Sequence, residues 1–354
     1  MSGNKSLHKA IKAKEDEFYT QLSDIEDELK YYKEHFKGKT VLCNCDDPRI
    51  SNFFHYFSYN FEKLGLKKLI ATCYKNQERD LFSQNKTEHA IWLEYEGDKN
   101  GNGVPDAEEI GVKDLKGDGD FRSAECIELL KQADIVVTNP PFSLFREYIA
   151  QLVKYKKKFL IIGNQNTITY KEVFSLLMEN KLWLGYKTGN MEFRVPDYYE
   201  PRPSRFWIDE KGNKWRSLGN ICWFTNMEIP KRHEELILYK TYSPEDYYKY
   251  DNYDAINVNK VSEIPCDYYG VMGVPITYVD KYNPNQFEIL GCTDRGGDNR
   301  PAINAIRLTE KPEDSAKING KKIYTRVFIR RRQQQTSEDV NIAADSGTQY
   351  GVDE

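Results

Sequence analysis

The sequence contains no long hydrophobic run, and no segment approaches the roughly 18 apolar residues that a membrane-spanning helix needs. Residues 1–5 also lack the apolar core of a secretion signal. Both absences predict a cytoplasmic protein. At 354 residues the chain is long enough for two domains, and its charged fraction of 30% indicates a solvated protein with long polar loops.

The sequence also lacks a cysteine framework and a zinc motif. Its seven cysteines are an odd number without regular spacing, no Cys-x-x-Cys is present, and its five histidines are scattered. These absences argue against a disulfide-stabilised secreted domain and against a zinc site. We therefore predict small packed cysteines in a reducing compartment and no bound metal.

An excess of positive charge is missing as well, since the formal net charge is −4. The charge is unevenly distributed, because residues 333–354 contain five acidic and no basic side chains, and the rest of the chain sums to +1. Basic residues gather at positions 5–14 and at 321–332, where the alternation predicts a strand with a basic face. Such runs are often only solvated surface, but local basic patches suffice to bind phosphate groups.

The most informative segment is Asn139-Pro140-Pro141-Phe142, which directly follows the apolar, β-branched run 134–138. The run predicts a buried strand, and the prolines end it because they fix φ and donate no N–H. An amide and an aromatic ring then stand at the carboxyl end of a strand, where open α/β sheets bind ligands. We interpret these four residues as a catalytic turn rather than an ordinary strand end.

The chemistry suited to this turn is methyl transfer to an amino group conjugated to a ring. The Asn139 side-chain oxygen and a proline carbonyl would accept the two amino hydrogens and free the nitrogen lone pair, while Phe142 stacks on the base. A base in a duplex must leave the stack to reach that geometry. Phe193 and Trp183 are candidates for a second stacking face, although both residues are more often part of a core.

A methyl donor, S-adenosylmethionine, should lie beside this turn, near the first predicted strand. The usual glycine-rich loop is missing there, and Asn44 and Asp46 within the sequence CNCDDP at 43–48 are the candidate ligands. A helix-capping turn is the alternative. The remaining cofactor candidates are Asp120 and Phe121 for the adenine, and Phe18, Tyr19 and Thr20 for the methionine end.

Residues 98–109 match the calcium-loop pattern D-x-N-x-N-G-x₅-E at every scored position. The context argues against a calcium site, because residues 90–95, which precede the loop, are predicted to form a strand of a hairpin, and Pro105 stiffens the loop. We therefore interpret the segment as a surface turn. The side chains that would otherwise bind the ion are Asp98, Asn100, Asn102, Asp106 and Glu109.

Strands and helices alternate along the first half of the sequence and predict a mostly parallel, doubly wound α/β sheet. The expected helices are 24–36, 51–59, 123–132, 143–154 and 171–180. The expected strands are 40–45, 68–74, 134–138, 158–163, 181–186 and 220–226, the last two as an antiparallel hairpin. Beyond Pro230, frequent tyrosines and turn signals indicate a smaller β-rich domain.

These patterns predict three parts. The first, 1–227, is a catalytic domain with a basic arm at 1–17 and an insertion at 76–119. The second domain is 228–332, and 333–354 is a disordered acidic tail.

Several segments together resemble the EcoRI-type adenine-specific DNA methyltransferases, and the resemblance spans residues 8–332. The segments are DEFYT (16–20), VLCNCDDPRISNFF (41–54), GDGDFRS (117–123), DIVVTNPPFSLFREY (134–148), FLIIGNQN (159–166), GVMGVPITYVDKYNPNQFEILG (270–291) and INGKKIYTRVFIRR (318–331). The resemblance implies a class I (Rossmann-like) methyltransferase sheet with a smaller C-terminal target-recognition domain. It also implies methyl transfer from S-adenosylmethionine to adenine N6 in double-stranded DNA, usually as the modification half of a type II restriction–modification system.

By the family pattern, residues 139–142 are catalytic, 18–20 and 120–121 line the cofactor site, and the second domain reads DNA. A cognate restriction endonuclease acting on the same site is the candidate partner, and no physical complex with it is implied. The candidate DNA-contacting residues are Arg202, Arg205, Arg295, Arg300, Arg330 and Arg331. The alternative for each of them is an arginine on the solvated surface without a role in binding. Two alternatives stay open. The same fold can act on RNA or on a protein glutamine, and a catalytically silent homologue can bind DNA without modifying it.

Overall fold

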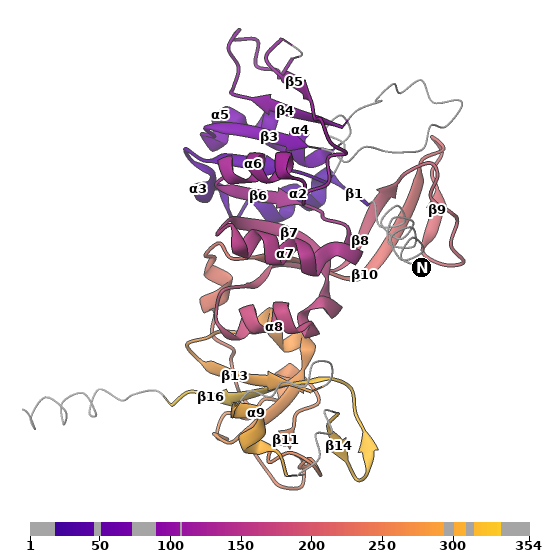
Figure 1. The fold of residues 1–354 in the computed structure, drawn as a ribbon. Coiled ribbons are helices and arrows are strands. Elements are labelled where there is room, and N and C mark those ends of the chain that lie inside the picture. The colour runs from indigo at the N-terminus through magenta and orange to yellow at the C-terminus, as the bar shows by residue number, and fades with distance from the viewer. Residues whose placement is uncertain are drawn as a thin grey trace, which may run out of the picture. The chain divides into compact units, whose positions relative to one another are not determined.

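The computed structural model of the chain describes residues 18–45, 51–72, 90–106, 108–293, 301–308 and 315–333 (Figure 1). The chain divides into two compact units, residues 1–232 and 233–354. Among the described residues, no helix combines the length and the apolar character that crossing a membrane requires.

The first unit is built on a sheet that contains ten strands among the described residues, in the order β1-β8-β10-β7-β6-β2-β3-β4-β5, with β9 paired to β10. The strands are β1 (Tyr19–Thr20), β2 (Thr40–Cys43), β3 (Lys68–Thr72), β4 (Ile91–Tyr95), β5 (Gly111–Asp114), β6 (Ile135–Thr138), β7 (Lys158–Asn164), β8 (Trp183–Val195), β9 (Phe206–Ile208) and β10 (Lys214–Thr225). The central strands β3, β2, β6 and β7 are parallel. The predicted α/β fold is therefore confirmed.

Helices cover both faces of this sheet, with α6 and α7 in front of it and α2 to α5 behind it in the view of Figure 1. The helices are α2 (Leu22–Leu29), α3 (Lys33–Phe36), α4 (Asn52–Tyr59), α5 (Phe61–Leu64), α6 (Ala124–Gln132), α7 (Phe145–Lys154) and α8 (Lys171–Met178), with short 3-10 turns η1 (Phe142–Leu144), η2 (Gln165–Thr169) and η3 (Pro230–His233). Because both faces are covered, the central strands are apolar throughout rather than alternating. Ser123, the first residue of the expected helix 123–132, caps α6, and its Oγ accepts the N–H of Cys126 at 3.2 Å.

The predicted single helix over 24–36 is wrong, because the chain breaks between α2 and α3. Tyr32 lies at the break, is fully buried, and donates its hydroxyl hydrogen to Glu28 Oε1 at 2.8 Å. Glu28 also accepts the N–H groups of Tyr186 and Lys187 on β8. The break thus lets one buried carboxylate tie α2 to the sheet, a long-range contact that local helix periodicity does not reveal.

The last two strands of the sheet form the predicted antiparallel pair but are longer than expected. Ile221 of β10 pairs with Asn164, the final residue of β7. The preceding residues of β10, 214–220, therefore extend past the carboxyl edge of the parallel strands, together with the second half of β8. This extension forms a wall beside the carboxyl edge, where α/β sheets place their sites.

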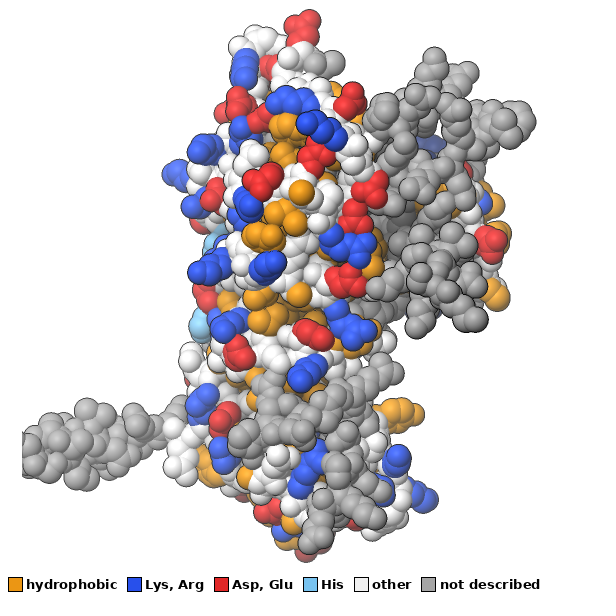
Figure 2. Space-filling model, viewed as in Figure 1, with side chains coloured by type: hydrophobic (Ala, Val, Ile, Leu, Met, Phe, Trp, Pro, Cys, Tyr) orange, Lys and Arg blue, Asp and Glu red, His pale blue; other side chains and the backbone are white. Residues whose placement is uncertain are grey.

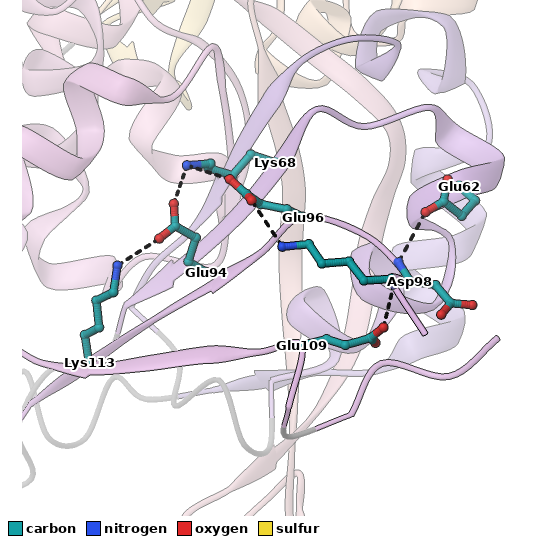
Figure 3. A network of polar contacts seen from close by, with 8 residues as sticks. Glu62, Lys68, Glu94, Glu96, Asp98, Glu109 and Lys113 are labelled. Carbon is teal, nitrogen blue, oxygen red and sulfur yellow. Dashed lines mark hydrogen bonds and ion pairs between the residues drawn. The ribbon is translucent and has the colours of Figure 1, made fainter. Parts of the chain in front are cut away.

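The segment expected as an insertion adds two antiparallel strands, β4 and β5, to the edge of the sheet beside β3. A cluster of charged side chains crosses these strands (Figure 3). The Lys68 ammonium on β3 forms ion pairs with Glu94 and, at 3.1 Å, with Glu96, while Lys113 on β5 pairs with Glu94 at 3.0 Å. The edge is thus held by ion pairs across neighbouring strands as well as by the backbone ladder.

The second unit contains a four-stranded sheet in the order β11-β12-β16-β13 among the described residues. Its elements are β11 (Ile256–Asn257), η4 (Val261–Glu263), β12 (Met272–Pro275), η5 (Ile276–Lys281), β13 (Phe287–Cys292), α9 (Pro301–Ile306), the hairpin β14 (Lys317–Ile318) and β15 (Lys321–Lys322), and β16 (Arg326–Arg331). Tyr250 and Tyr253 pack their rings against Phe328 of β16. Some of the crowded tyrosines therefore form the core of this unit.

The predicted strand with a basic face over 321–332 is wrong. Residues 321–322 belong to a separate hairpin, and the three consecutive residues 327–329 of β16 are all buried. The physical reason is that packing covers both faces of the strand. Tyr250 and Tyr253 pack on Phe328, and Val327 and Ile329, which point to the other face, are also fully buried.

Candidate active site

The candidate site lies at the carboxyl edge of the sheet, where β2 has β3 on one side and β6 on the other. Ligands of open α/β sheets bind at such a reversal of strand order. Asn44 follows β2 and Asn139 follows β6. The two strand ends are joined directly, because the Thr138 hydroxyl donates a hydrogen bond to the carbonyl of Asn44.

The Asn139 side chain is only 6% exposed and is held in one orientation. Its Nδ2 donates to the backbone carbonyl of Phe18 at 2.7 Å. Its Oδ1 is buried and has no hydrogen-bond partner among the described residues. A buried acceptor without a donor is unfavourable in a protein interior, so it requires an explanation, and a catalytic role is one such explanation.

An aromatic cluster surrounds this amide. Phe142 opens η1, is half-buried, and stacks on Phe18 with ring centroids 5.5 Å apart and planes 24° from parallel. Phe18 also contacts the rings of Phe193 at 5.5 Å and Tyr199 at 6.1 Å. The structure therefore brings the predicted turn, residue 18 and the wall formed by β8 into one cluster.

Phe193 and Trp183 were the two candidates for a second stacking face. Neither places an accessible ring beside the turn 139–142. Phe193 is fully buried behind Phe18. Trp183 pairs with Thr225, which in turn pairs with Leu160 near the start of β7, so Trp183 stands at the amino edge of the sheet. Four residues of strand, or roughly 13 Å, separate that level from Asn164 at the carboxyl end of β7. Two further strands, β10 and β7, lie between β8 and β6, so Trp183 does not line the turn and this candidate is wrong.

The cofactor candidates Asn44 and Phe121 are connected through Tyr148 of α7. The Tyr148 hydroxyl donates to Asn44 Oδ1, and the Tyr148 ring meets Phe121 edge-on with centroids 5.0 Å apart. Complete burial raises the pKa of Tyr148 well above its usual value, so its hydroxyl stays protonated as a donor. One buried phenol thus positions groups from two sequence-distant segments.

The Asp120 carboxylate stands beside Phe121 and is held by Arg122. Arg122 Nη2 lies 2.6 Å from Asp120 Oδ2, and its Nη1 lies 2.7 Å from Glu147 Oε2. Burial opposes ionisation of Asp120, but hydrogen bonds and the charge of Arg122 outweigh burial and lower its pKa. Asp120 is therefore an anion whose oxygens only accept hydrogen bonds, which suits an exocyclic amine as a donor.

The remaining cofactor candidates lie at the same edge. Tyr19 and Thr20 form β1, which pairs with β8, and the buried Thr20 Oγ1 has no hydrogen-bond partner among the described residues. Cys45, which follows Asn44, has φ 81°, a left-handed conformation uncommon for a residue with a side chain. Glycine is the residue that adopts this conformation without steric cost. Asp46 lies outside the described residues.

Sequence reasoning missed Thr138, Tyr148 and Tyr199 as parts of the site. Tyr148 belongs to the buried stripe of α7, which also contains Phe145, Ile149 and Leu152. That spacing is typical of a core face, and only the hydroxyl inside an otherwise apolar stripe signalled a polar role. No local signal identified Tyr199, which reaches the cluster from the loop after β8.

The candidate DNA-contacting arginines have different surroundings. Arg202 lies over the Tyr199 ring at 5.7 Å, and exposed Arg205 has φ 56°. In the second unit, Arg330 pairs with Glu288 at 2.9 Å, and Arg331 donates to the carbonyl of Cys266. The other two candidates, Arg295 and Arg300, lie outside the described residues.

The surface shown in Figure 2 intersperses Lys and Arg with Asp and Glu, and the described residues form no continuous basic patch on that face. The face shown in Figure 2 therefore does not gather the basic side chains that would bind a polyanion.

The loop 98–109 is closed by its own hydrogen bonds. Asp98 accepts the N–H groups of Gly101 and Gly103 at 2.6 and 2.7 Å, and Asp106 accepts both side-chain amides of Asn100 and Asn102. Glu109 Oε1 accepts two further N–H groups of the loop, whereas its Oε2 is buried without a partner among the described residues. No group of three or more His, Cys, Asp or Glu within the described part of the chain could hold a metal ion. The surface-turn interpretation stays a prediction.

Comparison with known proteins agrees with the site. Residues 6–332 match the family described as adenine-specific methyltransferase EcoRI. The chain is 52% identical to the type II methyltransferase M.EcoRI of Escherichia coli over 336 residues, which cover 94% of this chain and 98% of that protein.

Two mycoplasma proteins are also similar. M.MgeORF184P of Mycoplasma genitalium is 39% identical over 92% of this chain and 99% of its own length, and M.MpnI of Mycoplasma pneumoniae is 38% identical over 92% and 98%. No solved structure gives a significant match. The resemblance inferred from the sequence is confirmed, and the chain belongs to the EcoRI family of adenine-specific methyltransferases.

Proposed function

We propose that this methyltransferase transfers a methyl group from S-adenosylmethionine to N6 of an adenine flipped out of double-stranded DNA. We further propose that it acts in the cytoplasm as the modification half of a type II restriction–modification system, with a cognate endonuclease that recognises the same site. The relatives carry type II methyltransferase names. The proposal does not require a physical complex with the endonuclease.

The observation that carries the catalytic assignment is the unpaired, buried Oδ1 of Asn139. Nδ2 of the same amide donates a hydrogen bond to the Phe18 carbonyl. A 180° rotation of the amide, which would exchange Nδ2 and Oδ1, would therefore break that bond. The site therefore presents an acceptor, not a donor, and an amino group is its complement.

In the proposed mechanism, Asn139 Oδ1 accepts one hydrogen of the adenine amino group. The Pro141 carbonyl already accepts the N–H of Leu144 at 2.9 Å, so we assign the second hydrogen to the carbonyl of Pro140. Two acceptors draw the amino group out of conjugation with the ring and raise the nucleophilicity of its nitrogen. Phe142 stacks on the extruded base and fixes the direction in which the nitrogen lone pair points.

The residues at the carboxyl edge fit the proposed cofactor. Thr20 Oγ1 is a buried hydroxyl without a partner among the described residues, and the Asp120 carboxylate is anionic. We propose that Asn44 and Thr20 bind the methionine and ribose groups, and that Asp120 and Phe121 bind the adenine. The cofactor supplies an electrophilic methyl group, and the protein supplies its alignment with the amino nitrogen.

We propose that the second unit recognises the target sequence in DNA. Its described part is a small sheet with exposed aromatic and basic side chains, including Tyr269 and Arg330. Arg202 and Arg205 are proposed as contacts from the loop that joins β8 and β9. Such contacts would position the duplex through its phosphates, while base edges carry the sequence information.

The first prediction tests the proposed catalytic residue. Asn139→Ala removes the acceptor and should lower kcat for duplex DNA by about 10²- to 10³-fold, as loss of one preorganised polar group does in other enzymes. The assay measures transfer of a labelled methyl group from S-adenosylmethionine to duplex oligonucleotides, with RNA and whole-cell protein as parallel substrates. The labelled base is then identified after digestion.

Asn226→Ala is the matched control, because Asn226 bonds to residues 157–159 at the opposite edge of the sheet. It should lower stability and leave kcat unchanged. Transfer to RNA or protein alone would replace DNA as the substrate, and DNA binding without any transfer would contradict the enzyme assignment. Full activity of the Asn139 variant on DNA would refute the role given to the turn.

A further inference from the structure

Phe18 makes two separate contacts with the proposed catalytic turn. Its ring stacks on Phe142, and its backbone carbonyl accepts the Nδ2 hydrogen of Asn139 at 2.7 Å. Phe142 and Asn139 are the two groups that the proposed mechanism places on the base. A single residue from the start of the described chain therefore touches both halves of the turn.

The Phe18 ring is enclosed rather than open to a ligand. It is only 5% exposed, and the rings of Phe142, Phe193 and Tyr199 surround it at 5.5–6.1 Å. The sequence suggested that residues 18–20 contact the methionine end of the cofactor. The enclosure of the ring leaves that contact to Tyr19 and Thr20 and gives Phe18 a different task.

Phe18 is itself held firmly in place. The next two residues pair with β8, Tyr19 opposite Arg194 and Thr20 opposite Phe193. Asn52 at the start of α4 donates its side-chain N–H to the carbonyl of Thr20 at 2.7 Å. The position of the Phe18 carbonyl is therefore set by the sheet and by a helix, not by the turn that it contacts.

The stack also determines which face of Phe142 can receive a base. One face of the Phe142 ring is covered by Phe18, yet Phe142 as a whole is only half-buried. An incoming base must therefore stack on the uncovered side, in the order base, Phe142, Phe18. The plane of Phe142, and hence the plane of the base, then depends on the ring behind it.

We propose that Phe18 is a positioning residue for the target base. Its ring supports the Phe142 ring from behind, and its carbonyl holds the Asn139 amide in the orientation that leaves Oδ1 free. The inference rests on the proposed function of the turn. It assigns to residue 18 a role in the geometry of the methyl-accepting base. Loss of the ring leaves room for Phe142 to tilt, and a displacement of about 1 Å at a reacting group can cost 10²-fold in rate.

The test compares Phe18→Leu and Phe18→Ala with the unchanged enzyme in single-turnover methylation. Three quantities are measured: the methylation rate at saturating DNA and S-adenosylmethionine, the Kd of S-adenosylmethionine, and the fluorescence of 2-aminopurine at the target position of the duplex. We expect the rate to fall about 10-fold for Leu and up to 10²-fold for Ala. We expect the Kd of S-adenosylmethionine to change less than twofold, and the 2-aminopurine emission in the complex to change, since its stacking on Phe142 is altered.

Phe57→Leu is the matched control, because Phe57 is a fully buried ring that packs on Phe36. It should lower stability comparably and leave the rate and the fluorescence unchanged. Asn139→Ala and Phe142→Leu are measured in parallel. If those two lose activity while both Phe18 variants keep the full rate and unchanged emission, the positioning role is refuted and the turn is not.

If Asn139→Ala and Phe142→Leu keep full activity, the proposed function of the turn itself fails. If the Phe18 variants weaken S-adenosylmethionine binding in proportion to the loss of rate, Phe18 is a cofactor residue, which also overturns the inference. Recovery of most of the rate in Phe18→Tyr, which keeps the ring, would support it.

Discussion

At the scale of single residues, polar atoms buried near the carboxyl edge connect segments that are far apart in sequence. Tyr148 is fully buried among apolar neighbours of α7, yet its hydroxyl binds the side chain of Asn44. Thr138 binds the carbonyl of the same residue. Asn44 is thus fixed from two sides before any ligand arrives, which lowers the entropy that binding must overcome.

The second prediction concerns this fixation. Tyr148→Phe keeps the ring but leaves Asn44 Oδ1 without its donor, so we expect the free energy of unfolding to fall by about 1–3 kcal/mol. Because Asn44 is a proposed ligand of S-adenosylmethionine, its Kd should rise severalfold. Calorimetry measures the cofactor affinity and urea denaturation measures the stability.

Tyr278→Phe is the matched control for this change. Tyr278 is also fully buried, but its hydroxyl has no hydrogen-bond partner among the described residues. Removing that hydroxyl should leave the free energy of unfolding equal or slightly higher. Equal losses in both variants would show that the Tyr148 hydroxyl contributes no more than a generic buried phenol.

At the scale of elements, the edge formed by β3, β4 and β5 depends on charge. Hydrogen bonds from Lys68 lower the pKa of Glu94, and hydrogen bonds to Glu94 raise the pKa of Lys68 (Figure 3). A lowered carboxyl pKa stabilises the fold above the unfolded pKa, and this contribution is lost as the pH falls through the folded pKa. The raised pKa of Lys68 acts in the opposite direction, and its contribution is lost only in strong base.

The third prediction is therefore pH-dependent. Lys68→Met should destabilise the first unit by about 1–2 kcal/mol near pH 7, because Glu94 and Glu96 lose their shared partner. The difference from the unchanged protein should be constant near neutral pH and narrow as the pH falls below about 4.3, the pKa of a glutamate in the unfolded chain, toward the lowered pKa of Glu94. Thermal unfolding between about pH 3 and pH 8 measures this difference.

Lys131→Met provides the comparison for an exposed pair. Lys131 and Glu128 of α6 are separated by 2.6 Å, but more than half of each side chain is exposed. Such pairs contribute about 0–1 kcal/mol, so we expect little change. A Lys68 variant whose effect is equally small, or is independent of pH, would contradict the assigned role of the edge cluster.

The elements that the sequence predicts well are those with a strong local signal. β6 and β7 are continuous apolar runs, Ser123 marks the start of α6, and the two prolines mark the end of β6. Two of the three corrected predictions failed because long-range contacts decide them. Glu28 binds β8 and lies beside a helix break, and Phe328 in the middle of β16 is buried under Tyr250 and Tyr253.

The site shows the same division. The asparagine, the prolines and the phenylalanine of the turn form one contiguous motif, so the sequence predicts them directly. The neighbours of that motif come from β1, α7 and the loop after β8, and only the folded chain shows that Phe18 faces Phe142. Trp183 was misplaced because it is the first residue of β8 and lies level with the start of β7, a position that only the strand register shows.

At the scale of the whole molecule, charge rather than packing controls the binding of a polyanion such as DNA. The formal net charge is −4, and all five charged residues of the acidic tail, residues 333–354, are negative. Residues 334–354 of this tail lie outside the described residues. Without the tail the formal charge is +1. Exposed charges act over a Debye length of about 10 Å at 0.1 M salt, so a tethered anionic segment competes with DNA for basic groups within its reach.

The final prediction follows from that competition. A chain that ends at Gln333 should bind duplex DNA more tightly at low salt, and the gain should shrink as salt screens the charges. A full-length variant with the five acidic residues replaced by Asn or Gln should show the same gain, because the tail acts through its charge. Fluorescence anisotropy over a salt series measures both, with target and non-target duplexes. Since phosphate contacts carry no sequence information, both duplexes should gain equally. A gain confined to the truncated chain would indicate that the tail acts by its bulk, and no gain in either variant would show that it does not reach the DNA-binding surface.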